Sequence, residues 1–218
     1  MRRRNRSIIA AWMSMTALAA CSISPTAEGR AHSSPWVDLR PRTSLAPWEI
    51  TNFGGQGDVF VDEQGIVLEA GSPMTGIHLL REPPKTNYEL EVVATRVDGS
   101  DFFCGLTFPV GEAWSTLVLG GWGGSLVGIS CLDGKDAARN DTRRMVHFEN
   151  GRSYRVHLIV RPNRVTVDLD DERIVDYDPT AHQLTLRPEV VLSRPLGIAS
   201  FATTARIGTV RLRELAGH

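Results

Sequence analysis

Cysteine, excess basic charge and long apolar runs are all scarce in this chain. Three cysteines among 218 residues are too few for a fold that depends on several disulfides. The formal net charge is −1 and no basic stripe crosses the chain, which argues against nucleic acid and anionic membrane surfaces as partners. The apolar run over residues 8–20 is shorter than the roughly 20 residues that a membrane-spanning helix needs.

Several catalytic signatures are also missing from the sequence. No serine stands in a nucleophile elbow. The glycine-rich residues 120–124 lie between predicted strands rather than ahead of a helix, which excludes them as a phosphate-binding loop. His78, His147 and His157 fall in separate predicted strands without metal-ligand spacing, so each is interpreted as an isolated structural or surface residue.

The N-terminus carries the most informative pattern that is present. Four arginines within residues 2–6 precede the apolar run, and Leu18-Ala19-Ala20-Cys21 closes it, as in a secretory signal. This closing word resembles the lipobox of bacterial lipoproteins, in which the cysteine is lipidated and becomes the new first residue. We expect a signal peptide over residues 1–20 and lipidation of Cys21. The alternative is cleavage near Ala20 that leaves a free secreted domain.

This N-terminus also predicts where the mature chain resides. We expect an exported lipoprotein of the cell envelope, on the outer membrane or facing the periplasm, held to the membrane by its lipid anchor only. Ser, Pro, Ala, Thr and Gly dominate residues 22–35, which favours a flexible tether over residues 21–47 and one domain over residues 48–218. Without the four signal arginines the net charge becomes about −5.

From residue 48 onward, short apolar stretches alternate with turn signals about every eight to twelve residues. No stretch sustains a period of 3.6 residues, so helix is expected only in short turns. The sequence predicts an all-β domain, a two-sheet antiparallel sandwich. Its predicted strands cover residues 58–62, 66–69, 74–80, 88–96, 102–110, 114–119, 126–132, 154–160, 164–169, 173–177, 189–192, 196–201 and 205–215.

Two cysteines remain for the domain once Cys21 is lipidated. Cys104 and Cys131 can pair as a disulfide in an oxidising compartment. They can equally be small buried apolar residues on strands. The sequence leaves both readings open, because it gives no Cα distance with which to test bridge geometry.

Three segments near the C-terminus carry a family resemblance: residues 164–175, 195–200 and 207–215. Their order resembles the closing section of concanavalin A-like jelly rolls, the group that includes laminin-G-like lectins and glucanases. More narrowly, residues 48–215 resemble the 3-keto-disaccharide hydrolase-like family, a bacterial and often lipid-anchored branch of that fold. The resemblance implies a jelly roll that hydrolyses a glycoside or keto-glycoside by acid–base chemistry.

The chain departs from this family at its polar site positions. The cleft-facing carboxylate corresponds to Val93, the Asn-Ser-Gly word to Phe103-Cys104-Gly105, and the arginine to a position near Phe108. The acidic word corresponds to residues 115–121, which contain no acid. Apolar side chains cannot transfer a proton or hold a sugar hydroxyl, so the inherited site is predicted to be stripped or rebuilt.

Two acids on one strand are the catalytic candidates that remain. Glu89 and Glu91 are two residues apart, so their side chains share one face, opposite Tyr88 and Leu90. Two carboxylates that converge on one bond are what glycoside hydrolysis needs. The simpler interpretation is that they form the solvated face of a half-buried strand, as acids on sheets commonly do.

A second acidic segment offers oxygen ligands for a metal. Asp133, Asp136 and Asp141 could hold Ca²⁺, although their spacing matches no recognised calcium loop. Asp, Asn and Gly are also the residues that an ordinary turn selects, and a turn is the favoured interpretation. No other cofactor is expected.

Aromatic residues in the middle of the chain are candidates for ligand binding. Trp114 and Trp122 flank the strand that leads into residues 120–124. Indole faces stack on the apolar faces of sugar rings, and glycines allow close approach to the backbone. For Trp114 a core position is preferred, whereas Trp122 has only glycines beside it to pack against. Asp101, which ends the turn before residue 102, is a further ligand-binding candidate.

The sequence therefore predicts a carbohydrate as partner, with the mode of action open. The family resemblance implies a hydrolase, whereas the lost polar positions favour a non-catalytic carbohydrate-binding domain. A passive structural domain at the cell surface is the third possibility, because a fold by itself does not fix a function.

Overall fold

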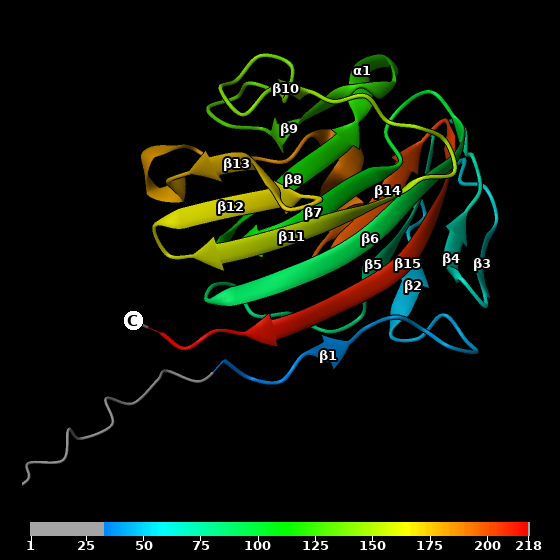
Figure 1. The fold of residues 1–218 in the computed structure, drawn as a ribbon, viewed down its shortest axis with the longest axis horizontal. Coiled ribbons are helices and arrows are strands. Elements are labelled where there is room, and N and C mark those ends of the chain that lie inside the picture. Colours follow the sequence, from blue (N-terminus) through cyan, green and yellow to red (C-terminus); the bar gives the residue numbers. More distant parts are fainter. Residues whose placement is uncertain (1–32, 218) are drawn as a thin grey trace, which may run out of the picture. The chain divides into compact units, whose positions relative to one another are not determined.

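The computed structural model describes residues 33–217, which form two antiparallel β-sheets packed face to face (Figure 1). This architecture confirms the predicted all-β jelly-roll sandwich. The first sheet has eight strands, in the spatial order β13 (Glu172–Tyr177), β12 (Arg164–Leu169), β11 (Ser153–Arg161), β6 (Tyr88–Gly99), β15 (Thr203–Glu214), β4 (Gly65–Leu68) and β3 (Val59–Asp62), with β1 (Val37–Asp38) paired to β15.

The second sheet has seven strands and lies behind the first in Figure 1. Their spatial order is β10 (Arg144–Met145), β9 (Leu126–Ser130), β8 (Ala113–Gly120), β7 (Cys104–Val110), β14 (Gly197–Phe201), β5 (Met74–Leu79) and β2 (Trp48–Ile50). In the described part of the chain, helix is confined to three short pieces, as expected: α1 (Gly121–Gly124), η1 (Pro179–Ala181) and η2 (Pro188–Ser193). Within residues 33–217, no helix is long and apolar enough to cross a membrane.

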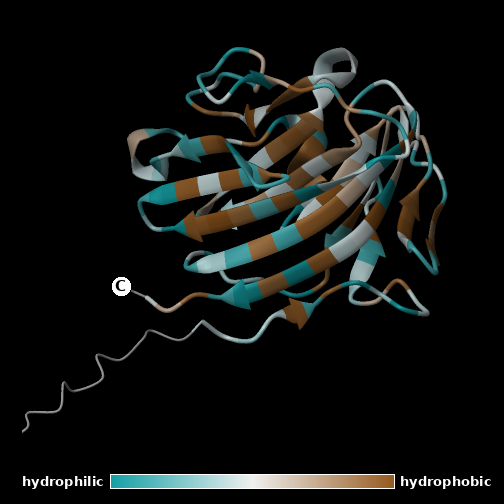
Figure 2. Cartoon of the chain, viewed as in Figure 1, coloured by the Kyte–Doolittle hydropathy of each residue, from teal (hydrophilic) through white to brown (hydrophobic). Residues whose placement is uncertain are grey.

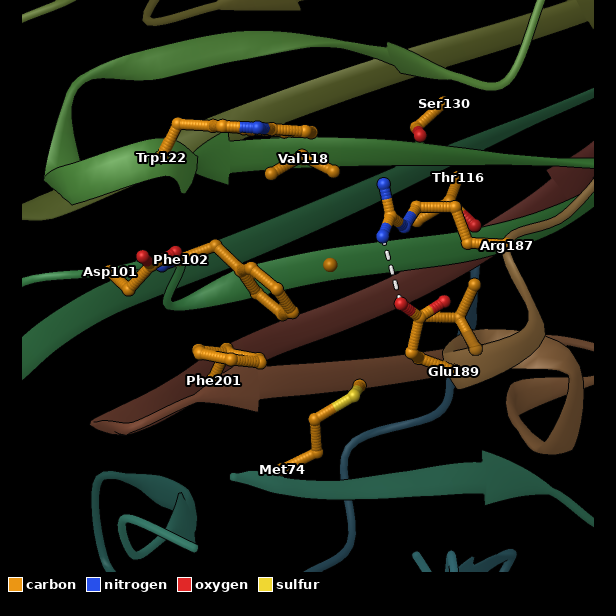
Figure 3. A pocket seen from close by; sticks show the side chains of 12 residues that line it. Met74, Asp101, Phe102, Thr116, Val118, Trp122, Ser130, Arg187, Glu189 and Phe201 are labelled. Atoms are coloured by element: carbon orange, nitrogen blue, oxygen red, sulfur yellow. Dashed lines mark hydrogen bonds and ion pairs between the residues drawn. The ribbon is translucent and has the colours of Figure 1, made fainter. Parts of the chain in front are cut away.

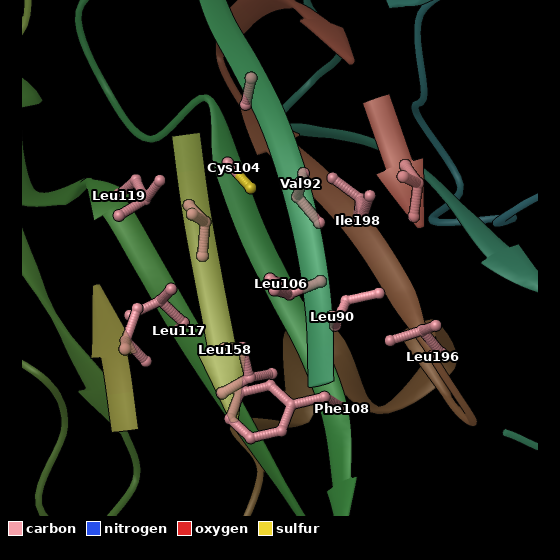
Figure 4. Packing of buried hydrophobic residues seen from close by; sticks show 14 of the residues in the cluster. Leu90, Val92, Cys104, Leu106, Phe108, Leu117, Leu119, Leu158, Leu196 and Ile198 are labelled. Carbon is pink, nitrogen blue, oxygen red and sulfur yellow. The ribbon is translucent and has the colours of Figure 1, made fainter. Parts of the chain in front are cut away.

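The core lies between the two sheets and follows from strand alternation. Apolar and polar residues alternate along several strands of the eight-stranded sheet (Figure 2), so each strand points one row of apolar side chains inward. Leu90 and Val92 from β6 meet Leu106 from β7, Leu117 from β8 and Ile198 from β14 (Figure 4), and all five side chains are fully buried. Burial of each such side chain contributes about 1.5–3 kcal/mol to folding.

The sandwich begins earlier than the sequence predicts. β1 pairs with β15, and Leu39 is buried in the main core. The indole Nε1 of Trp48 also donates a hydrogen bond to the carbonyl oxygen of Leu39 over 2.7 Å. The tether predicted to run to residue 47 therefore overlaps the folded domain, because prolines in this segment exclude helix but do not exclude edge pairing. The signal peptide and Cys21 lie outside the described residues.

One predicted strand is wrong. Residues 189–192 belong to the 3₁₀-helix η2, which packs on β5 and β14 instead of pairing with a strand. Pro188 opens this helix with its fixed φ, and the backbone N–H of Val190 donates to the carbonyl oxygen of Arg187. The run of apolar residues resembles a strand, but the flanking Pro188 and Pro195 offer no N–H for a ladder.

Candidate functional site

On the outer face of the seven-stranded sheet, several neighbouring positions carry no large side chain. Gly105 pairs with Val118 on β8 and with Ala199 on β14, and Ala199 pairs in turn with Gly76 on β5. A Cβ at position 105 would lie 3.0 Å from the ring of Phe102, which shows that the ring rests against the bare backbone. Small residues in one row across three neighbouring strands, Gly105 on β7, Ala199 on β14 and Gly76 on β5, thus leave room above the sheet.

A cavity of about 200 Å³ occupies this room (Figure 3). Its walls divide into two parts. Aromatic and aliphatic side chains lie on one side, whereas the Arg187–Glu189 pair and two hydroxyl groups lie on the other. The lining residues are Met74, Asp101, Phe102, Gly105, Thr116, Val118, Trp122, Ser130, Arg187, Glu189, Val190 and Phe201.

Trp122 extends over the cavity from the turn between β8 and β9. Its side chain remains 46% exposed, although it is one of the largest apolar groups in the chain. Its φ of 50° lies in the left-handed region, which a bulky residue rarely adopts. The flanking Gly120 and Gly123 also have positive φ, so the glycines shape the turn that presents the indole. Such strain at an exposed aromatic residue is typical of functional sites.

Asp101 holds this turn in place. Its Oδ2 accepts a hydrogen bond from the backbone N–H of Gly123 over 3.3 Å, and its Oδ1 accepts one from the N–H of Phe102 over 2.7 Å. The carboxylate therefore links the two chain segments that supply Phe102 and Trp122 to the cavity. Two predicted ligand-binding residues, Asp101 and Trp122, are brought to the same site.

Arg187 and Glu189 form the polar wall. Arg187 Nη2 donates to Glu189 Oε1 over 2.8 Å, and Arg187 Nη1 lies 3.6 Å from Asp136 Oδ2. The hydrogen bond from Arg187 holds the pKa of Glu189 below its usual range. Glu189 is thus ionised at neutral pH. Thr116 and Ser130, which pair with each other across β8 and β9, supply hydroxyl groups beside this ion pair.

Trp114 is on the same face of the sheet but does not line the cavity. Its side chain is partly buried rather than in the core, because it points to the outer face two residues before Thr116. The indole Nε1 donates to the carbonyl oxygen of Pro195 over 3.0 Å, and the Arg194 guanidinium lies 5.2 Å from the ring centroid. The segment that follows η2 thus covers Trp114.

Glu89 and Glu91 lie on the outer face of the eight-stranded sheet, whereas the cavity lies on the other sheet. Both residues are buried, at 4% and 7% exposure, beneath longer side chains. Glu89 accepts hydrogen bonds from His157 Nε2 and Arg213 Nε, and Glu91 pairs with Arg211 at 2.9 Å. The structure brings these two acids together with arginine side chains and His157, and not with the ligand-binding candidates.

This pairing differs from the solvated face that alternation alone indicates. Along one row across five strands, Arg211, Glu91, His157, Asp168 and Arg173 stand opposite one another. Basic and acidic side chains alternate in this row, and the long arginine side chains cover the shorter acids.

The three candidate metal ligands do not converge. Asp133 accepts hydrogen bonds from His182 Nδ1 and from the backbone N–H of Gln183, which hold the pKa of its carboxyl below the usual range. Asp136 is paired with Arg139 at 2.9 Å, and Asp141 is exposed. Across residues 33–217, no group of three or more His, Cys, Asp or Glu side chains could hold a metal ion.

Cys104 and Cys131 are free thiols in the structure, and both are buried. Cys104 lies in the core between the sheets, where burial raises the pKa of its thiol to about 12. A thiol with this pKa stays protonated at neutral pH and is a poor nucleophile.

The residues that the sequence analysis aligned with polar positions of the resembled hydrolase family lie in three different places. Val93 points outward from the eight-stranded sheet, and Phe103, Cys104 and Phe108 are in the core. Gly105 is at the floor of the cavity, as are Thr116 and Val118 from the segment matched to the family's acidic word.

Sequence reasoning missed the five lining residues that come from β5, β14 and the segment around η2. These are Met74, Phe201, Arg187, Glu189 and Val190. The sequence does hold one indication for Met74, Phe201 and Val118. Each is an apolar residue at a strand position whose side chain, by alternation, faces away from the core. Arg187, Glu189 and Val190 come from the loop that folds over the sheet, and no periodic pattern reports its position.

Comparison with known proteins finds similar folds but no similar sequence family. No family model matches it, and no curated protein matches its sequence. Carbohydrate-binding module CBM66 from Bacillus subtilis is 16% identical, with a TM-score of 0.53 over 75% of this chain and 93% of that one. The Crh5 transglycosylase is 14% identical, with a TM-score of 0.59 over 85% and 86%. A protein with a galectin-like fold from Bacillus subtilis is 10% identical, with a TM-score of 0.60 over 85% and 97%. The chain shares its jelly-roll fold with these proteins.

Proposed function

We propose that this domain binds a carbohydrate in the cavity on the outer face of the seven-stranded sheet and does not hydrolyse it. The observation that carries the proposal is Trp122, a half-exposed indole held over the cavity by a strained glycine-flanked turn. An indole presents a flat apolar face at little conformational cost, and the apolar face of a sugar ring stacks on it. The solved structures with the same fold include a carbohydrate-binding module and a transglycosylase, which is consistent with this ligand class.

The two-sided lining of the cavity suits an amphipathic ring. A sugar that places its apolar face toward Trp122 and Phe102 directs hydroxyl groups toward Thr116, Ser130 and Arg187. Hydroxyl groups and guanidinium N–H groups are the partners that sugar hydroxyls need. The ion pair with Glu189 fixes the orientation of Arg187 before a ligand arrives.

Binding without hydrolysis is favoured by the state of the two acids in the cavity. A glycosidase needs one carboxyl that is protonated near neutral pH. Glu189 is held ionised by Arg187, and both oxygens of Asp101 already accept backbone N–H groups. Neither carboxyl group among the described lining residues is therefore suited to donate a proton to a leaving group.

The proposal is tested by glycan-array binding and glycoside turnover with the full-length chain and its Trp122→Ala variant. We expect binding without turnover, and affinity that falls about tenfold or more without the indole. The control is Phe60→Ala, because Phe60 on β3 is 45% exposed and lies on the other sheet. Equal affinity of Trp122→Ala and Phe60→Ala would refute the site. Glycoside turnover by the wild type that is lost in Glu189→Gln or Asp101→Asn would make the protein a hydrolase.

We also propose that the domain is exported and anchored by a lipid on Cys21. The support is the arginine-rich start and the Leu18–Cys21 word. Metabolic labelling with a fatty acid in a bacterial host tests this, and we expect Cys21→Ser to abolish the label. Label that persists in the variant, or a wild-type chain that carries none, would contradict the anchor.

A further inference from the structure

The cavity has an apolar subsite that a fully hydroxylated sugar would leave poorly matched. Met74, Val190 and Ala199 form a second buried apolar cluster, separate from the main core, and Phe102 and Phe201 pack against it. All five side chains belong to the outer side of the seven-stranded sheet or to η2, where water would otherwise contact them. Four of them line the cavity, Met74, Phe102, Val190 and Phe201, and we call these four the apolar subsite. Ala199 is fully buried.

The subsite provides no hydrogen-bond partners of its own. Each of its four side chains is aliphatic, aromatic or a thioether. The polar wall of Arg187 and Glu189, with the hydroxyl groups of Thr116 and Ser130, lies on the side of the cavity away from Phe102 and Phe201 (Figure 3). A sugar hydroxyl pressed against the subsite would lose its water without a replacement, and each such loss is costly. A methyl group at the same place would gain from burial.

The charges around the cavity favour a neutral ligand. Arg187 is matched by Glu189 at 2.8 Å and by Asp136 at 3.6 Å. The remaining charged residue in the lining is Asp101, which is negative. A carboxylate or sulfate group on the ligand would therefore find no unmatched cation among the described lining residues.

We propose that the bound sugar unit is neutral and carries a small apolar substituent, such as a 6-deoxy methyl, O-methyl or O-acetyl group, which occupies the apolar subsite. This inference rests on the proposed carbohydrate function and adds the substrate class. The cavity of about 200 Å³ is below the roughly 300–1,000 Å³ of common ligand pockets. The substituent must therefore be small.

Calorimetric titration of the full-length chain with matched pairs of methyl glycosides tests the inference. Members of a pair differ only in whether a hydroxyl is free, deoxygenated, methylated or acetylated. An acetylated polysaccharide and its alkali-treated, deacetylated form make a second matched pair. We expect about tenfold tighter binding of the substituted members, from methyl burial together with avoided hydroxyl desolvation.

Two variants locate the preference in the subsite. Met74→Thr makes one wall polar, and we expect it to remove most of the preference for the substituted members. Gly105→Ala leaves the walls apolar but places a methyl 3.0 Å from the Phe102 ring. It should therefore lower the affinity most for the glycosides that carry the larger substituents. Val97→Thr, at a 41% exposed position on β6, is the matched control and should change nothing. Unfolding midpoints of all variants confirm that each is folded.

The outcomes separate the two proposals. Glycan binding that depends on Trp122 would still contradict this inference in three cases: no preference within the pairs, a preference for the free-hydroxyl members, or tighter binding of a sulfated methyl glycoside titrated in parallel. Each of these results overturns this inference and leaves the proposed function standing. No binding to any glycan overturns both.

Discussion

The guanidinium of Arg96 donates a hydrogen bond to the carbonyl oxygen of Gly124, 3.1 Å away. Arg96 belongs to β6 of the eight-stranded sheet, whereas Gly124 ends the turn that presents Trp122. Arg96 also donates to the carbonyl oxygen of Phe148 and to Oδ1 of Asn150, and it is only 7% exposed. A buried cation thus joins the Trp122 turn to the opposite sheet through neutral oxygens.

Replacing Arg96 should therefore destabilise the domain and loosen its binding turn. In Arg96→Met, the carbonyl groups of Gly124 and Phe148 lose their donor while remaining buried. We expect the free energy of unfolding to fall by about 2–3 kcal/mol, because hydrogen bonds to charged groups contribute more than neutral ones. Denaturant unfolding followed by circular dichroism measures the change. Arg42→Met is the control, since Arg42 pairs with Asp38 on the surface and should cost less than about 0.5 kcal/mol. Equal losses in the two variants would show that the Arg96 contacts are not stabilising.

The strands of this fold were predictable because the alternation of apolar and polar residues within each strand indicates which of its faces is buried. Tyr88, Leu90 and Val92 alternate with Glu89 and Glu91, and this pattern places them on opposite faces without knowledge of any partner strand. The segment around Glu189 was not predictable in the same way. Its apolar residues bury themselves against β5 and β14 from a 3₁₀-helix, so burial there depends on tertiary packing instead of a local period.

The candidate site was predictable only in part, for a similar reason. Glycine neighbours identify Trp122 as a side chain with nothing local to pack against, and the cavity does contain it. Arg187 and Phe201 reach the same cavity from segments more than sixty residues further along the chain. Their contribution depends on strand order, since β14 lies between β7 and β5 and η2 folds over β14, and no spacing in the sequence encodes that order.

Acid should destabilise the protein through its paired carboxyl groups. Hydrogen bonds from the Arg139 side chain hold the pKa of Asp136 below its ordinary value, although burial opposes this shift. The folded state then binds the proton only at a lower pH than the unfolded state, whose Asp pKa is about 3.9. The stabilisation is therefore complete above that pH and is lost as the pH falls through the folded-state pKa.

The variant Asp136→Asn tests whether stability falls with decreasing pH because of this carboxyl group. Unfolding midpoints of the wild type should be constant between about pH 5 and pH 7 and should fall below about pH 4. The variant should be less stable at neutral pH and should lose less stability on acidification. Glu112→Gln is the control, because Glu112 is exposed beside Lys85. A variant that keeps the full acid dependence would exclude Asp136 as a contributor.

Glu89 is expected to act in stability and not in ligand binding. Its carboxylate is buried beneath Arg213 and His157 on the sheet that does not carry the cavity. In Glu89→Gln the Arg213 guanidinium loses its counter-charge and His157 loses the carboxylate that it contacts. We expect a loss of about 2 kcal/mol in unfolding free energy, because both side chains retain some contact with water. Glycan affinity measured by calorimetry should be unchanged. Glycoside turnover in the wild type that disappears in this variant would instead assign Glu89 the catalytic role that its strand position first indicated.

Alkylation of the two buried thiols tests whether Cys104 and Cys131 are free or form a disulfide. Because burial raises the pKa of Cys104 to about 12, its thiol should not react with iodoacetamide in the native protein at pH 8. After unfolding without a reductant, Cys104 and Cys131 should both be alkylated, since both are free in the structure. Intact-mass spectrometry of a Cys21→Ser chain counts the added groups, so the lipidation site does not contribute. A chain that gains two groups only after reduction would show that the cysteines pair with each other, and the packing of Cys104 between the two sheets would then differ from the arrangement described above.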